Sequence, residues 1–298
     1  SLHDALPILN SYLMADGSRF TDKAGYETMT FDQECQNRDP RLAQTIRTPG
    51  YTRIGSTKKE APNLAYTMTG YHLIKYSMTA NYDEYNKSCN DIPLFRTAEV
   101  YLNFAEAKAE LGTLKQADIN KSIKLLRDRV GMTNLDMELA NSKPDPYLMS
   151  AATGYPNVKG ANQGVILEIR RERTIELAME GFRYYDIMRW KEGKLFENDL
   201  LGIYVPGPGT YDLDKDGTDD VCFYVGTKPA GNVPLYLEIG EQIRLSNGES
   251  GYIICHSLIT KKWNEDRDYL YPVPISERTL SNGVITQNPG WNDGLNFN

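Results

Sequence analysis

The stretch VILEIRRERTIELAMEGFRYYDIMRW, residues 165–190, decides the fold of this chain. Ile175, Met179 and Phe182 recur at i, i+4 and i+7, the spacing of one apolar face on an α-helix. Gly181 interrupts the pattern, so we expect two consecutive helices with a break at that glycine. The stretch therefore predicts a helical hairpin.

Charged side chains run beside this apolar face. Glutamates at successive i+4 spacings would repel one another by a few tenths of a kcal/mol per pair on a solvated helix. A catalytic carboxylate pair for glycan hydrolysis is one alternative, but the neighbouring arginines would keep the carboxylates ionised, which suits salt bridges better than proton donation. We therefore predict no enzymatic activity and a buried structural ion network made of Glu172, Arg173, Glu176, Glu180, Arg183, Asp186 and Arg189.

An earlier helical hairpin is expected on the N-terminal side. Its first helix runs from about residue 94 to residue 111 and is closed by Gly112. It has two apolar stripes, which predict burial on both faces. The stripes are Val100, Phe104, Ala107 and Leu111, and Ala98, Leu102, Ala105 and Ala109. A second helix begins at Asp118 and ends before Gly131, and residues 134–164 are expected to form a long polar loop.

The two ends of the chain are rich in turn-forming residues. In residues 1–92 we expect loops with short strands at 28–31 and 73–78, and we expect the first nine residues to contribute little. Beyond Gly193, short apolar segments near 221–225 and 251–255 favour strands, and the proline-containing tail favours an extended strap. Trp190 and Trp291 are expected in the core.

Composition excludes several classes of function. A net charge of −7, from 33 basic and 40 acidic residues, argues against binding to nucleic acid. No apolar run reaches the length of a membrane span, and the start at Ser1 suggests that any targeting segment lies upstream. Spacing argues against a zinc site, and both free and paired states are open for Cys35, Cys89, Cys222 and Cys255.

The segment DLDKDGTDD, residues 212–220, matches the start of an EF-hand calcium loop. Position 12 is Phe223, so the bidentate glutamate of such loops is missing. A Ca²⁺ site and a solvated acidic turn are therefore both open. The ligands of the possible calcium site, at loop positions 1, 3, 5, 7 and 9, are Asp212, Asp214, Asp216, Thr218 and Asp220.

Four stretches together resemble the C-terminal part of the SusD/RagB family, the outer-membrane lipoproteins of Bacteroidota that bind nutrients, mostly glycans, at the cell surface. They are NRDPRLAQTI (37–46), RTAEVYLNFAEAKAELG (96–112), ERTIELAMEGFRYYDIMRW (172–190) and the tail from YPVPISE to NGVITQNPGW (271–291). The family's N-terminal portion, with the lipid-bearing cysteine, has no counterpart in this sequence.

The resemblance implies a mainly α fold with tetratricopeptide-like helical hairpins, a large loop-rich region and few short strands. Residues 1–298 would form one domain fragment, with a loop-rich ligand side (1–92), a hairpin scaffold (93–193) and a loop-rich C-terminal region with its strap (194–298). The implied partner is a TonB-dependent transporter of the SusC type, and no cofactor is required. Membrane association would run only through the lipid anchor.

Glycan binding would rest on aromatic faces that stack against sugar rings. The candidates are Tyr26, Phe31, Tyr51 and Tyr66 in the loop-rich first part of the chain. A helical scaffold without its own ligand, or a helical glycan-degrading enzyme, are the alternatives. A glycine–serine elbow for nucleophilic catalysis is absent from the sequence.

Overall fold

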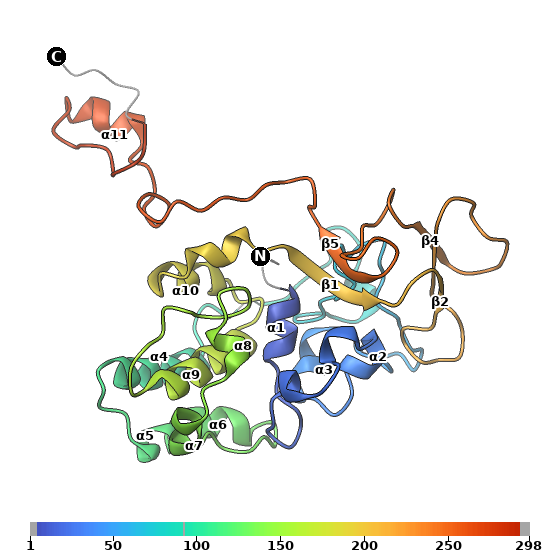
Figure 1. Ribbon diagram of the computed structural model, residues 1–298, viewed down its shortest axis with the longest axis horizontal. Coiled ribbons are helices and arrows are strands. Elements are labelled where there is room, and N and C mark those ends of the chain that lie inside the picture. Colours follow the sequence, from blue (N-terminus) through green and yellow to red (C-terminus); the bar gives the residue numbers. More distant parts are fainter. Residues whose placement is uncertain (1–4, 92, 293–298) are drawn as a thin grey trace.

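The computed structural model describes residues 5–91 and 93–292, with helices gathered at one end and two small sheets at the other (Figure 1). The fold is mainly helical. The α-helices are α1 (Ala5–Ser11), α2 (Phe31–Glu34), α3 (Arg41–Thr45), α4 (Thr97–Glu110), α5 (Gln116–Asn120), α6 (Ile123–Asp128), α7 (Met137–Ser142), α8 (Pro146–Met149), α9 (Gln163–Glu176), α10 (Arg183–Arg189) and α11 (Ile275–Leu280). Short 3₁₀ turns are η1 (Phe20–Asp22), η2 (Tyr26–Thr28), η3 (Ala80–Tyr82) and η4 (Gly193–Glu197).

Helix α9 is the centre of the helical half. Every residue from Gly164 to Glu176 is buried, because α1, α4, α6 and α7 all pack against it. A helix buried on all sides needs its charged residues paired. The predicted break before α10 is confirmed, and it is wider than one residue because Met179 and Gly181 both adopt positive φ angles.

Helix α4 is buried on one face only. Its alanine-rich stripe, which includes Leu102 and Ala105, packs against α9 in the helical core. Val100 and Leu111 of the other stripe are 63% and 75% exposed. The prediction of two buried faces is therefore wrong, because α9 and α6 both approach from the same side.

The chain between α4 and α9 is more helical than the sequence predicted. The single helix expected from Asp118 is two short ones, α5 and α6, separated at Ser122, whose backbone leaves the helical region. The expected polar loop at 134–164 contains α7 and α8. Asp136 and Asp145 cap these helices by accepting backbone N–H groups, which starts a helix without a long apolar pattern.

The N-terminal residues contribute more than expected. Leu6 and Leu9 of α1 are buried beside Tyr12 in a second core, which the sheets and the loops before residue 74 complete. The strands expected at 28–31 and 73–78 are wrong. The first lies across η2 and the start of α2, and Leu73 forms only an isolated bridge with Ile46.

In the described part of the chain, five short strands form two sheets. β1 (Leu200–Val205) pairs antiparallel with β5 (Gly251–Cys255), and β3 (Val221–Tyr224) lies between antiparallel β2 (Gly209–Tyr211) and parallel β4 (Leu235–Glu238). The strands predicted near 221–225 and 251–255 are confirmed. Their buried residues, among them Val221, Phe223 and Ile253, belong to the second core.

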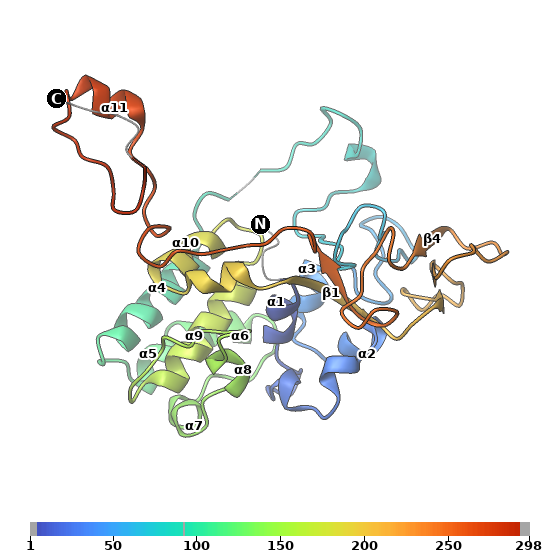
Figure 2. The same cartoon turned by 45° about the horizontal axis from the view of Figure 1, so that its top comes forward.

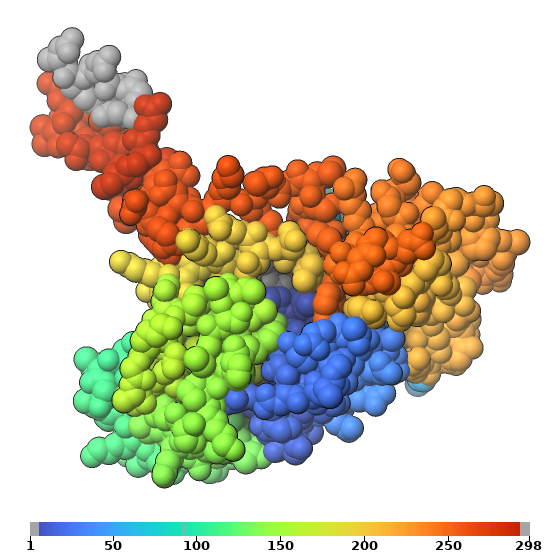
Figure 3. Space-filling model, viewed as in Figure 1, coloured from blue at the N-terminus to red at the C-terminus, as the bar shows by residue number. Residues whose placement is uncertain are grey.

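The tail is an extended strap that ends in a short helix. It leaves β5, crosses over α10 and carries α11 clear of the body (Figure 2; Figure 3). The helix was not predicted. Trp190 is buried as expected, but Trp291 lies outside both cores, where its indole N–H donates to the carbonyl of Leu270 in the same tail.

All four cysteines are free, two of them buried and one, Cys89, exposed. Within the described ranges we find no helix with the length and apolar content needed to cross a lipid bilayer.

Candidate functional site

A groove of about 500 Å³ opens where the loop at 58–66 meets the acidic loop that joins β2 to β3. Strand β2, where the acidic loop begins, lies at the opposite end of the molecule from α4 to α9 (Figure 1). The N–H group of Gly50 donates to the carbonyl of Asp214 at 3.0 Å, which fastens the turn at residues 48–51 to the acidic loop. The lining combines charged and polar side chains with apolar ones: Arg47, Lys58, Lys59, Glu60, Ala61, Pro62, Asn63, Leu64, Ala65, Tyr66, Asp214, Asp216, Thr218, Asp219, Asp220, Val221, Pro234 and Leu235.

Among the four aromatic candidates, only Tyr66 lines this groove. Its side chain is 85% exposed, so the ring face is open to a ligand. Tyr51 lies nearby under the guanidinium of Arg47, 5.5 Å from its ring centroid. Tyr26 lies in a different, shallower groove and packs edge-on against Phe20.

Phe31 is a core residue, which corrects its assignment as a ligand contact. Only 2% of it is exposed, and its ring packs against Tyr71 in the second core. It begins α2 behind an N-terminal cap at Thr30, where a bulky apolar side chain turns inward. A buried ring cannot stack on a sugar.

Several groove side chains are held by the chain itself. Arg47 pairs with Glu60 at 3.1 Å and donates to the carbonyl of Ala61 at 3.2 Å. Lys59 donates from Nζ to the carbonyl of Lys215 at 2.6 Å. These bonds fix the basic wall of the groove, which sequence reasoning missed because it is formed by contacts between distant loops.

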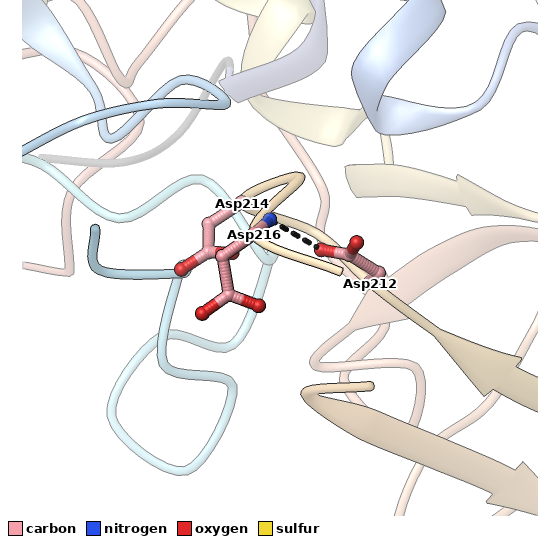
Figure 4. A group of neighbouring side chains, drawn as sticks. All are labelled: Asp212, Asp214 and Asp216. Carbon is pink, nitrogen blue, oxygen red and sulfur yellow. Dashed lines mark hydrogen bonds between the residues drawn. The ribbon is translucent and has the colours of Figure 1, made fainter. Parts of the chain in front are cut away.

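The acidic loop brings three of the five predicted calcium ligands together. One carboxylate oxygen each from Asp212, Asp214 and Asp216 lies within 4.8 Å of the others (Figure 4). Asp216 N–H donates to Asp212 at 3.3 Å, the bond drawn in Figure 4. Burial raises the pKa of Asp214, and the charge of Asp216 raises it further, which is the effect a bound cation would relieve.

The other two predicted ligands are placed less favourably. Asp220 accepts the backbone N–H groups of Leu213 (2.7 Å) and Asp214 (3.4 Å), so its carboxylate holds the loop closed. Thr218 lies in the exposed part of the loop. Phe223, at loop position 12, is buried in β3, so the site would be completed by water or by other oxygens.

The glutamates of α9 form ion pairs with cations from distant parts of the chain. Glu172 is wholly buried and accepts from Arg41 at 2.5 Å and from Arg127 at 2.9 Å. Glu176 also pairs with Arg41, at 3.0 Å, and with Arg129, at 2.8 Å. The network thereby ties α3 and α6 to α9.

Glu180 continues this network beyond the end of α9. It receives Arg96 at 2.6 Å and Lys75 at 2.5 Å, and Arg96 also reaches Glu176 at 2.7 Å. The loop before α4 is thereby fastened to the turn between α9 and α10.

The arginines of α9 and α10 pair elsewhere. Arg173 donates to Asp186 at 2.7 Å, and Arg189 donates to the other oxygen of Asp186 at 2.9 Å. Arg183 donates to the hydroxyl of Tyr155 at 2.7 Å. The sequence placed these residues in the network but did not identify the cations that neutralise the glutamates.

Electrostatics in this network favour ionised carboxylates. Burial alone would raise the pKa of Glu172, but the charges and hydrogen bonds of Arg41 and Arg127 lower it to about 2. The pKa of Glu176 is also lowered, because hydrogen bonding from Arg96 and the charge of Arg41 outweigh burial. A carboxylate held ionised is a salt-bridge partner and not a proton donor at neutral pH.

Fold and groove together define a mainly helical scaffold that holds a loop-built groove, lined by charged, polar and apolar side chains, with one exposed aromatic ring. The chain belongs to the SusD family, whose family model matches residues 5–291.

Two solved structures from Bacteroides fragilis are similar to this chain. One, a SusD-like carbohydrate-binding protein, is 22% identical with a TM-score of 0.54, over 92% of this chain and 46% of its own. The other, a SusD-like protein, is 22% identical with a TM-score of 0.58, over 95% and 46%. This chain thus spans less than half of each relative. No curated protein matches it.

Proposed function

We propose that this chain is a cell-surface oligosaccharide-binding protein and that the groove beside Tyr66 is its glycan site. The observation that carries the proposal is the open ring of Tyr66 above a groove lined with hydrogen-bonding side chains. Sugar rings have apolar C–H faces that pack on aromatic rings, and their hydroxyls need polar partners around the rim. Membership of the SusD family supports the same activity.

The delivery step is the second part of the proposal. A TonB-dependent outer-membrane transporter of the SusC type receives the glycan, and the protein is attached to the outer membrane by lipid, as the family implies. Helices α4 to α10 gather at the end of the molecule away from the β2–β3 connection (Figure 1), which leaves a rigid scaffold for docking while loops shape the ligand site. We also propose one domain, in which α4 to α10 form tetratricopeptide-like hairpins.

A glycan array combined with a reducing-sugar assay tests the proposed function. We expect binding to oligosaccharides without release of reducing ends. Release of reducing ends would show a glycan-degrading enzyme instead. If neither binding nor release is detected, the chain is a helical scaffold without its own glycan ligand.

Tyr66→Ala tests the location of the site. Loss of the stacking ring is expected to weaken binding of the array-identified glycan about tenfold, because an aromatic face contributes on the order of 1–2 kcal/mol. Isothermal titration calorimetry measures the change. Tyr85→Ala is the matched control, because Tyr85 is 93% exposed and does not line the groove. Equal affinity of the Tyr66→Ala variant and the unmodified protein would place the site elsewhere.

We further propose that the loop of Asp212, Asp214 and Asp216 binds Ca²⁺. Calcium at about one hundred times its Kd is expected to raise the free energy of unfolding by about 2.7 kcal/mol. Thermal unfolding with calcium and with chelator measures the difference. The Asp212→Asn substitution should abolish the stabilisation by calcium. The Asp266→Asn substitution, which removes one negative charge from the tail instead, should leave that stabilisation unchanged. Identical melting temperatures with calcium and with chelator would show that the loop is a solvated acidic turn that does not bind Ca²⁺.

A further inference from the structure

We infer that the groove, when free of Ca²⁺, selects neutral oligosaccharides over those that carry carboxylate or sulfate groups, an inference that rests on the proposed glycan site. Acidic side chains outnumber basic ones around the groove, five to three. The acidic ones are Glu60, Asp214, Asp216, Asp219 and Asp220, and the basic ones are Arg47, Lys58 and Lys59.

The basic side chains are less available to a ligand than their number suggests. Arg47 is already paired with Glu60 and bonded to a backbone carbonyl, so the charges of this pair offset each other and leave four acidic side chains against two basic ones. The ammonium group of Lys59 donates to the carbonyl of Lys215. An anionic sugar would have to compete with these bonds. Within residues 5–91 and 93–292, Lys58 is the one basic residue of the lining whose side chain has no such interaction.

The acidic wall is exposed where a ligand would enter. Asp216 and Asp219 are exposed, and they line the same groove as Tyr66. A ligand anion held within a few ångströms of two such carboxylates lies inside the Debye length, so salt screens the repulsion only in part.

A neutral sugar meets the opposite situation. Its hydroxyl groups donate hydrogen bonds, and ionised carboxylates are strong acceptors. The same aspartates that repel a uronate or a sulfate can therefore bind a neutral ring stacked on Tyr66. The charge of these aspartates therefore disfavours anionic sugars, while their oxygens accept hydrogen bonds from neutral ones.

Matched pairs of oligosaccharides test this selectivity. Each pair shares one backbone and differs by a single uronic acid or sulfate, and binding is measured at low salt with chelator present. We expect the charged member to bind about tenfold more weakly or worse, and the gap to narrow in about 0.5 M salt. Charged members that bind as tightly as neutral ones, or more tightly, would overturn the inference and leave glycan binding intact. Absence of binding to every probe would overturn both.

The Asp219→Asn variant tests whether this groove sets the selectivity between neutral and charged oligosaccharides. Removal of one exposed charge is expected to lower severalfold the ratio of the affinity for the neutral oligosaccharide to the affinity for its charged counterpart. This expectation concerns the ratio and not either affinity alone. Asp266→Asn removes the same charge outside the groove and should leave the ratio unchanged. If the ratio of affinities is unchanged in the Asp219→Asn variant, or falls equally in the Asp266→Asn control, the groove does not set the selectivity.

Discussion

We expect Glu172→Gln to lower the free energy of unfolding by about 3 kcal/mol or more at pH 7, because it breaks a buried ion pair by removing one partner. Glu172 neutralises Arg41 and Arg127, both buried. Arg41 keeps Asp39 as a partner at 2.6 Å. Among residues 5–91 and 93–292, the one other carboxylate paired with Arg127 is Glu168, at 3.9 Å, so little but this distant charge and the carbonyl of Thr133 would offset the guanidinium. Denaturant unfolding at pH 7 measures the loss.

The pH dependence gives this prediction a second readout. The folded-state pKa of Glu172, about 2, lies below its usual value of 4.5. A lowered pKa contributes stability above the unfolded-state pKa, and that contribution is lost as the pH falls from about 4.5 toward 2. The Glu172→Gln variant should lack this part of the acid transition.

Glu110→Gln is the matched control for Glu172→Gln. Glu110 is half exposed and lies 3.6 Å from Arg170, which is buried and keeps Glu192 as a partner at 3.3 Å. Removal of a half-exposed carboxylate whose partner keeps another ion pair is expected to cost about 1 kcal/mol at most. Equal stability of the Glu172→Gln and Glu110→Gln variants would show that the α9 network does not hold the fold together.

The sequence predicted the glutamates of this network but not the distant arginines that pair with them. Three glutamates at i+4 spacing inside an apolar helix can be buried only with partners, and that argument needs no coordinates. The partners Arg41, Arg96 and Arg127 lie 45 to 135 residues away from the glutamates they bind, and no local spacing marks them. Ion pairs between distant elements depend on how helices cross, which periodicity does not encode.

The groove shows the same limit. Tyr66 and the acidic loop were each predicted as candidates, for different functions, from local composition. Their shared groove depends on the packing of the 58–66 loop against the β2–β3 connection, a contact between segments about 150 residues apart. Phe31 was misassigned for a related reason, since a phenylalanine in a polar stretch has the same local signal whether its ring turns inward or outward.

A second large effect is expected at Glu34, in the second core. Glu34 is 94% buried, and its Oε1 atom has no hydrogen-bond partner among the described residues, whereas Oε2 accepts from Tyr71 at 3.2 Å. Burial raises its pKa to about 8, and the nearby charge of Arg38 and the Tyr71 bond only partly oppose that shift. Cys35 and Tyr252 are the other titratable groups that interact with this carboxyl.

The sign of the effect follows from the raised pKa. The unfolded chain releases the proton near pH 4.5, whereas the folded protein keeps it until about pH 8. Stability is therefore complete below pH 4.5, falls as the pH rises through that interval and levels off above about 8. Each unit of difference between the folded and unfolded pKa corresponds to about 1.4 kcal/mol of unfolding free energy. Because the side chain of the Glu34→Gln variant cannot ionise, its unfolding free energy at pH 8 should exceed that of the unmodified protein by several kcal/mol.

Unfolding free energies measured between pH 5 and 8 decide whether Glu34 is protonated in the folded protein. The Glu34→Gln curve should lie close to that of the unmodified protein at pH 5 and rise above it as the pH increases. Glu27→Gln, at an exposed carboxylate, should follow the unmodified protein throughout. Parallel curves for Glu34→Gln and the unmodified protein would mean that Arg38 keeps Glu34 ionised in the core. The attraction of that guanidinium would then exceed the cost of burying the carboxylate, as it does for Glu172 with two arginines.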